Sequence, residues 1–145
     1  MILCCSLLLN AQRQMDPKMI ELIKSKKVAF ITEQVGLTSQ EGEKFWPVYN
    51  NLEKERMELM NHKRDLEEST EDKTIKSEEY YRKLANEIAA THSKEGRLSE
   101  EYNTKFLSIL PAEKVVKLYR SERKFRSYLM QEMRKKDGEK DKQGK

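Results

Sequence analysis

Residues 36–50 read GLTSQEGEKFWPVYN, and this stretch predicts the end of one helix and the start of the next. Gly36 suits a helix C-terminus because glycine readily adopts the left-handed conformation found there. Thr38 and Glu41 have the spacing of a capping box, in which each side chain accepts a hydrogen bond from the backbone N–H of the other residue. Phe45 and Tyr49 follow at helical spacing. The stretch therefore predicts two helices that meet at a corner.

The helix that begins at Thr38 continues with leucines seven residues apart, at positions 52, 59 and 66, which is typical of a long helix packed against another. Pro47 predicts a kink, or a restart of the helix near Trp46. The polar segment 67–76 is expected to form a loop. On the other side of the corner, Asp16-Pro17 opens a helix, because aspartate caps helices and proline fits their first turn.

Two further helices are expected after the loop. Ser77 caps the third, which continues through Gly96 to Ile109, and Pro111 begins the fourth. The apolar line of the third helix consists of Tyr81, Leu84, Ile88, Thr91, Leu98, Tyr102 and Phe106. The buried face of the fourth is expected to consist of Val115, Leu118, Glu122, Phe125, Leu129 and Met133. The spacing in both helices is mostly three or four residues, which predicts amphipathic helices.

The composition supports an all-α fold of four helices in one domain. The chain has 145 residues, of which 37% are charged and 37% hydrophobic, and a formal net charge of +4. The near balance of charge and the apolar periodicity argue against disorder. Helices with this much charge bury little apolar area alone, so we expect a homodimer. The interspersed acidic residues argue against a nucleic-acid partner.

The N-terminal residues 1–11, MILCCSLLLNA, are predicted to form a secretory signal, with Leu9 and Ala11 at the cleavage positions. Their short length and lack of basic residues favour a start codon further upstream. A buried N-terminal helix and a lipid anchor on Cys4 or Cys5 are the alternatives. Cleavage would remove both cysteines and leave no membrane span in the mature chain. We expect residues 12–136 to form the exported helical domain and residues 137–145 a disordered charged tail.

A weak internal repeat connects two corners of the chain. Residues 37–41, LTSQE, align with residues 110–114, LPAEK, so that Phe45 falls opposite Leu118 and Trp46 opposite Tyr119. Each copy has a leucine, a residue that starts a helix, and a polar group in the first turn that can satisfy free backbone N–H groups. The motif residues are Leu37, Thr38, Glu41, Phe45, Leu110, Pro111 and Glu113.

Residues 36–50 and 106–115 resemble the two signatures of the Spy/CpxP-like periplasmic proteins, which are named for their LTxxQ motifs. The chain departs from the motif at Glu41, where the family has glutamine, and in the second copy at Pro111 and Lys114. The Phe-Trp-Pro-Val-Tyr extension after the first motif indicates a divergent branch. The resemblance covers roughly residues 17–133.

This resemblance implies a protomer folded as a long helical hairpin, with two protomers pairing antiparallel into a thin, curved cradle. It also implies a periplasmic protein of the envelope stress response. Its function would be that of an ATP-independent chaperone that shields unfolded or partly folded proteins. The alternative is a stress or heavy-metal sensor that acts on a membrane signalling partner, such as an anti-sigma factor or a sensor kinase. The scarcity of histidine and cysteine favours the chaperone.

Two groups of side chains are candidates for contact with a client or partner. The first is a basic band on the fourth helix, which includes Lys117, Arg120 and Lys124. It is interpreted either as a client-attracting surface or as a solvated face balanced by Glu113–Lys117 and Glu122–Arg126 pairs. The second is Trp46 with Tyr49, which either pack in the core or contact a partner. Because Phe45 and Trp46 are adjacent, one of the two is expected to be partly exposed.

Sequence motifs for catalysis and for cofactor binding are missing. His62 with Glu58 and His92 with Glu95 are each spaced to share one helix face, but a tight metal site needs three or four ligands. No glycine-rich phosphate loop or nucleophile motif occurs. We therefore predict no enzyme activity, no metal site and no cofactor.

Overall fold

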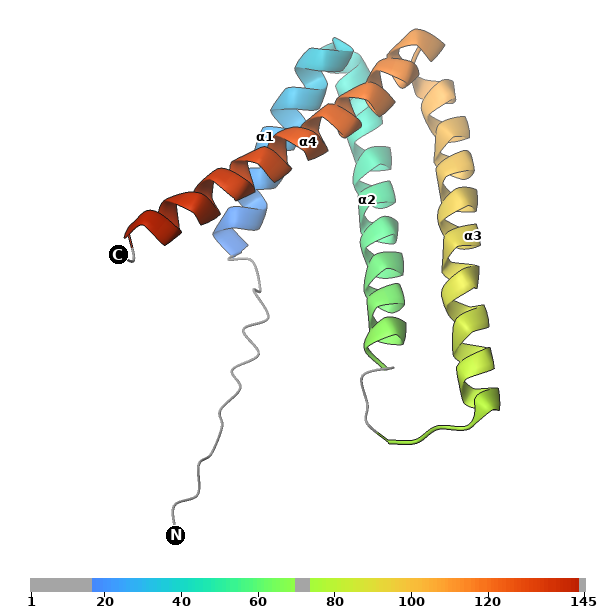
Figure 1. The fold of residues 1–145 in the computed structure, drawn as a ribbon. Coiled ribbons are helices and arrows are strands. Elements are labelled where there is room, and N and C mark those ends of the chain that lie inside the picture. The colour runs from blue at the N-terminus through green and yellow to red at the C-terminus, as the bar shows by residue number, and fades with distance from the viewer. Residues whose placement is uncertain (1–16, 70–73, 144–145) are drawn as a thin grey trace.

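The computed structural model describes residues 17–69 and 74–143, which form four helices and no strand. The helices are α1 (Pro17–Val35), α2 (Ser39–Glu68), α3 (Glu78–Ile109) and α4 (Ala112–Gln143). In Figure 1, α2 and α3 form a long antiparallel hairpin, and α1 and α4 pack side by side at one end of it. The predicted all-α class with four helices is confirmed. The predicted signal lies outside the described residues.

The helix ends follow the predicted capping signals. Gly36 has a φ of 69° and closes α1, with Gly36 N–H and Leu37 N–H both donating to the Thr32 carbonyl. Thr38 caps α2 with a complete capping box, and Ser77 caps α3 by accepting from Tyr80 N–H. Three of the predicted ends are therefore confirmed at the level of their hydrogen bonds.

Three predicted details of the helices are wrong. The first concerns α2. Of the kink and the restart expected at Pro47, the restart does not occur, because the helix runs unbroken to Glu68. Residues 67 and 68, expected in the loop, are therefore helical. Proline removes one backbone hydrogen bond, and packing of Phe45 and Tyr49 on either side of it offsets that loss. The second is the place of Tyr81 in the apolar line of α3, because its side chain is exposed in the first turn of that helix.

The third detail is the tail. Helix α4 continues to Gln143, through most of the segment 137–145 that we expected to be disordered. Lysine, glutamate and glutamine supply four of the residues 137–143 and are good helix formers, whereas Asp137, Gly138 and Asp141 are weaker ones. The segment continues a helix that packing has already nucleated.

The core lies where the four helices meet, beside the corner between α1 and α2 and the corner between α3 and α4. It consists of Ile31, Val35, Phe45, Tyr49, Leu52, Tyr102, Phe106, Leu110, Val115 and Leu118. Phe30 and Phe125 extend this packing between α1 and α4, and their ring centroids lie 5.6 Å apart. Further along the hairpin, α2 and α3 pack against no other described helix, and α3 buries Leu84 and Thr91 there. The far part of the hairpin is thus a single layer of two helices (Figure 1).

Candidate binding surface

The two copies of the internal repeat contact each other in space. Glu41 Oε2 accepts a hydrogen bond from Thr38 N–H at 2.8 Å, as the capping box requires, and one from Lys114 Nζ at 2.6 Å. Lys114 Nζ also donates to the Gly36 carbonyl at 2.7 Å. Glu41 and Lys114 are the fifth residues of their motif copies. Two of the three positions at which the chain departs from LTxxQ therefore form an ion pair that connects the corners.

The hydrogen bond from Lys114 and the one from the Thr38 backbone hold the pKa of the Glu41 carboxyl below its usual value of 4.5. A carboxyl whose pKa is lower in the folded chain than in the unfolded chain stabilises the fold at pH values above the unfolded pKa. That stability is lost as the pH falls through the folded pKa. The corner pair is thus expected to weaken in acid.

Glu41→Gln tests this pair, because glutamine keeps the capping oxygen and removes the charge. We expect the variant to melt at a lower temperature than the wild type at pH 7, and the gap to narrow as the pH falls below 4.5 and through the lower folded pKa of Glu41. Circular dichroism melts at pH 7 and in acid measure it. The other carboxyls titrate in both proteins, so only the difference matters. A gap that is equally large in acid would contradict the assignment.

The second corner is built around Leu110 and Pro111. Leu110 is buried and its N–H donates to the Phe106 carbonyl, which ends α3. The Pro111 carbonyl accepts from Lys114 N–H and begins α4. Glu113, in the first turn, pairs with Lys117 at 2.7 Å, and this hydrogen bond lowers the pKa of Glu113. The predicted Glu113–Lys117 pair is therefore confirmed.

The aromatic residues after the first corner divide into buried and half-buried ones. Phe45 is fully buried and packs against Tyr49 and Phe106, with ring centroids 5.3 and 5.4 Å away. Tyr49 is 2% exposed, so it is not accessible to a partner. Trp46 is half-buried with its ring edge-on to Phe45. The prediction that one of two adjacent aromatics is partly exposed is confirmed, and that residue is Trp46.

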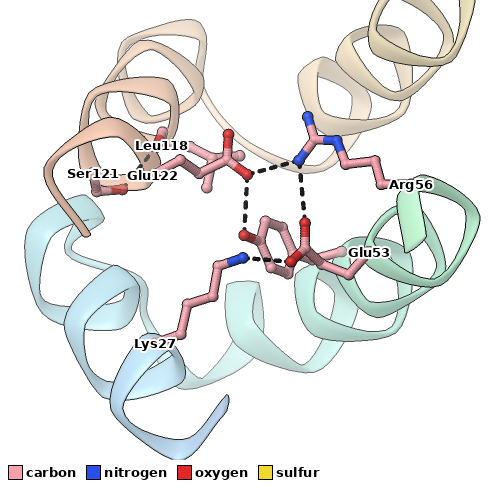
Figure 2. A network of polar contacts seen from close by, with 7 residues as sticks. Lys27, Glu53, Arg56, Leu118, Ser121 and Glu122 are labelled. Carbon is pink, nitrogen blue, oxygen red and sulfur yellow. Dashed lines mark hydrogen bonds and ion pairs between the residues drawn. The ribbon is translucent and has the colours of Figure 1, made fainter. Parts of the chain in front are cut away.

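A polar network that the sequence did not reveal connects α1, α2 and α4 (Figure 2). The Glu122 carboxylate of α4 accepts from the Tyr49 hydroxyl and from Arg56 Nη1, each at 3.0 Å. Arg56 also donates to Glu53 at 3.2 Å, and Lys27 of α1 pairs with the other oxygen of Glu53. The network thus alternates two cations and two anions beside the buried tyrosine.

Burial and the neighbouring Glu122 charge raise the pKa of Tyr49, so its hydroxyl stays protonated and donates. Burial by itself would lower the pKa of Arg56, but the Glu122 and Glu53 carboxylates together outweigh burial and raise that pKa. The one signal in the sequence was Glu122, a charged residue in the predicted buried line of α4. Its partners were not predictable, because they lie 66 and 73 residues away.

The inward position of Glu122 changes the interpretation of the basic band. The side chain of Glu122 is 12% exposed and is bonded to α2, so the predicted Glu122–Arg126 pair does not form. Between Val116 and Gln131 it is the only acidic residue of α4. The exposed charges of this part of the helix are all basic. We call them the basic face, which consists of Lys117, Arg120, Arg123, Lys124 and Arg126.

Neither histidine is part of a metal site in the described part of the chain. His92 Nδ1 lies 3.8 Å from Glu95, and Glu58 contacts Lys54 instead of His62. Among residues 17–69 and 74–143, no three histidine, cysteine, aspartate or glutamate side chains converge on a point. None of the helices described is apolar over a length that would cross a bilayer.

Comparisons of the chain with protein-family models, with curated proteins and with solved structures found no match. The resemblance to the Spy/CpxP-like proteins therefore rests on the two motif segments. The fold and contacts described above come from the structure of this chain and from no relative.

Proposed function

We propose that this chain is an exported, Spy/CpxP-like binding protein that shields non-native segments of other proteins without ATP. The observation that carries the proposal is an open hairpin with exposed methionines. Met57 and Met60 of α2 are 52% and 54% exposed, and both lie beyond Leu52, the last α2 residue of the core. Methionine side chains are flexible and polarizable, which suits a surface that contacts many different apolar segments.

The two corners support the same proposal. The motif copies, which are the basis of the resemblance, lie together and share the Glu41–Lys114 pair. Charged residues surround the exposed methionines, among them Lys54 and Glu58. Such charges keep the protein soluble while apolar groups stay exposed. We further propose that two protomers pair antiparallel, since the thin hairpin leaves both of its faces available for a second copy.

A denatured test protein that aggregates on dilution provides the measurement. We expect the equimolar wild-type chain to suppress its light scattering, more strongly at low salt. Met57→Gln with Met60→Gln should lose most of that suppression, because the apolar contact area is removed. The control is Asn50→Gln with Asn51→Gln, which alters two exposed positions of the same helix without removing apolar area.

Sedimentation of the same samples reports whether the active species has the mass of two chains. No suppression at several-fold excess of the wild type would reject the chaperone function. Equal suppression by the methionine variant and the wild type would reject the assigned surface.

A further inference from the structure

Charge is divided between the two helix pairs of this protein. Helices α1 and α4, which pack side by side, carry fifteen basic and eight acidic residues. Helices α2 and α3, which form the hairpin, carry ten basic and fourteen acidic residues. The pairing of the first helix with the last brings this excess of positive charge together. The molecule is therefore an electrical dipole, with a basic helix pair and an acidic hairpin.

The basic face of α4 is where the positive charge is least compensated. Arg120, Arg123 and Arg126 form no ion pair within the described chain, and each is exposed. Lys117, Arg120, Arg123 and Arg126 lie three residues apart, with Lys124 between the last two, and together they extend over about 14 Å of helix. Arginine forms paired, planar hydrogen bonds with phosphate and carboxylate oxygens. The basic face thus fits an extended anionic partner.

Apolar side chains are interleaved with these cations. Four large ones on α4 are between 39% and 57% exposed: Val116, Tyr119, Tyr128 and Met130. Tyrosine has an apolar ring and a polar hydroxyl, and it is enriched where proteins meet the headgroup region of a bilayer. The outward face of a single helix is convex, so it suits a broad surface better than it suits a peptide, which is usually held in a groove.

We propose that the basic face of α4 docks this protein on anionic membrane surfaces, with the arginines at lipid phosphates. The charge division orients the molecule, because an anionic bilayer attracts α1 and α4 and repels the acidic hairpin. The hairpin then points away from the membrane. This inference is independent of the proposed chaperone function, which depends on the hairpin.

The test is sedimentation of the full-length chain with phosphatidylcholine vesicles that contain about one third phosphatidylglycerol, at low salt. The variant is Arg120→Gln, Arg123→Gln and Arg126→Gln, which keeps residues with good helix propensity. We expect its partition coefficient to fall about 150-fold, from roughly fivefold for each cation removed near an anionic surface. Vesicles of phosphatidylcholine alone measure any contribution from the apolar residues 1–11.

The matched control is Lys83→Gln, Lys94→Gln and Arg97→Gln, which removes three exposed positive charges from the hairpin. It should bind the anionic vesicles nearly as well as the wild type, because the hairpin is held away from the membrane. An equal loss in both triple variants would show an effect of net charge and overturn the proposal. So would the absence of binding to anionic vesicles, or binding of equal strength to neutral ones. Binding to poly-glutamate without binding to vesicles would instead indicate an acidic protein partner.

Discussion

Phe45→Ala is expected to destabilise the protein by about 3–5 kcal/mol, which is the usual cost of truncating a fully buried phenylalanine. Phe45 is 0% exposed, and its ring packs against those of Tyr49 and Phe106. It lies near the first corner, so its loss affects the contacts of α2 with α3 and with the core around α4. Since natural domains have a free energy of unfolding of only about 5–15 kcal/mol, the variant should lose a large part of its stability and unfold at a much lower urea concentration.

Urea unfolding followed by circular dichroism measures this effect, and Leu107→Ala is its control. Leu107 is next to Phe106 in sequence and 47% exposed, so its truncation should cost much less. Similar midpoints for the two variants would contradict the assignment of Phe45 to the centre of the core.

Glu122→Gln is expected to lower the free energy of unfolding by about 2–3 kcal/mol. The substitution leaves Arg56 without its second carboxylate and weakens the acceptor of the Tyr49 hydroxyl. Breaking a fully buried ion pair costs about 3–5 kcal/mol, and the expected value is lower because Arg56 is 35% exposed and keeps Glu53. The substitution removes a connection between α4 and α2.

A double-mutant cycle with Arg56→Met separates the pair from its surroundings. We expect the double variant to lose less free energy of unfolding than the two single variants lose together, by about 1 kcal/mol or more. The reason is that neither Arg56 nor Glu122 is then left as a charge without its partner. Glu101→Gln is the control. Glu101 pairs with Lys105 on an exposed face, where such pairs contribute well under 1 kcal/mol. Additive effects of the Arg56 and Glu122 substitutions would show that the network does not couple the helices.

Most of the helix boundaries were predictable, because they depend on residues close in the chain. Gly36, Thr38 and Ser77 act on backbone groups within four residues of themselves, and the apolar spacing of each helix is a local pattern. The errors occurred where tertiary packing or neighbouring helix formers outweighed a local signal. Pro47 stays within a helix because its neighbours are buried, and residues 137–143 continue a helix that begins in the core.

The candidate sites were less predictable than the helices. Trp46 and the cations of α4 were identified from the sequence, and the structure leaves Trp46 half-buried and those cations exposed. It buries Tyr49 instead and turns Glu122 inward. A helical wheel gives the face of a residue but not which neighbouring helix covers that face. The exposure of a side chain therefore follows only when the helix partners are known.

The sequence by itself determined four amphipathic helices and the two corners between them, because capping and periodicity act over a few residues. Only the tertiary structure decided that α1 packs against α4, since that contact joins segments at opposite ends of the chain. This pairing separates the basic helices from the acidic hairpin. It also brings Glu41 to Lys114 and Glu122 to Arg56, across 73 and 66 residues. Such partners are chosen by the shape and charge of whole helix faces, which no local stretch of sequence encodes.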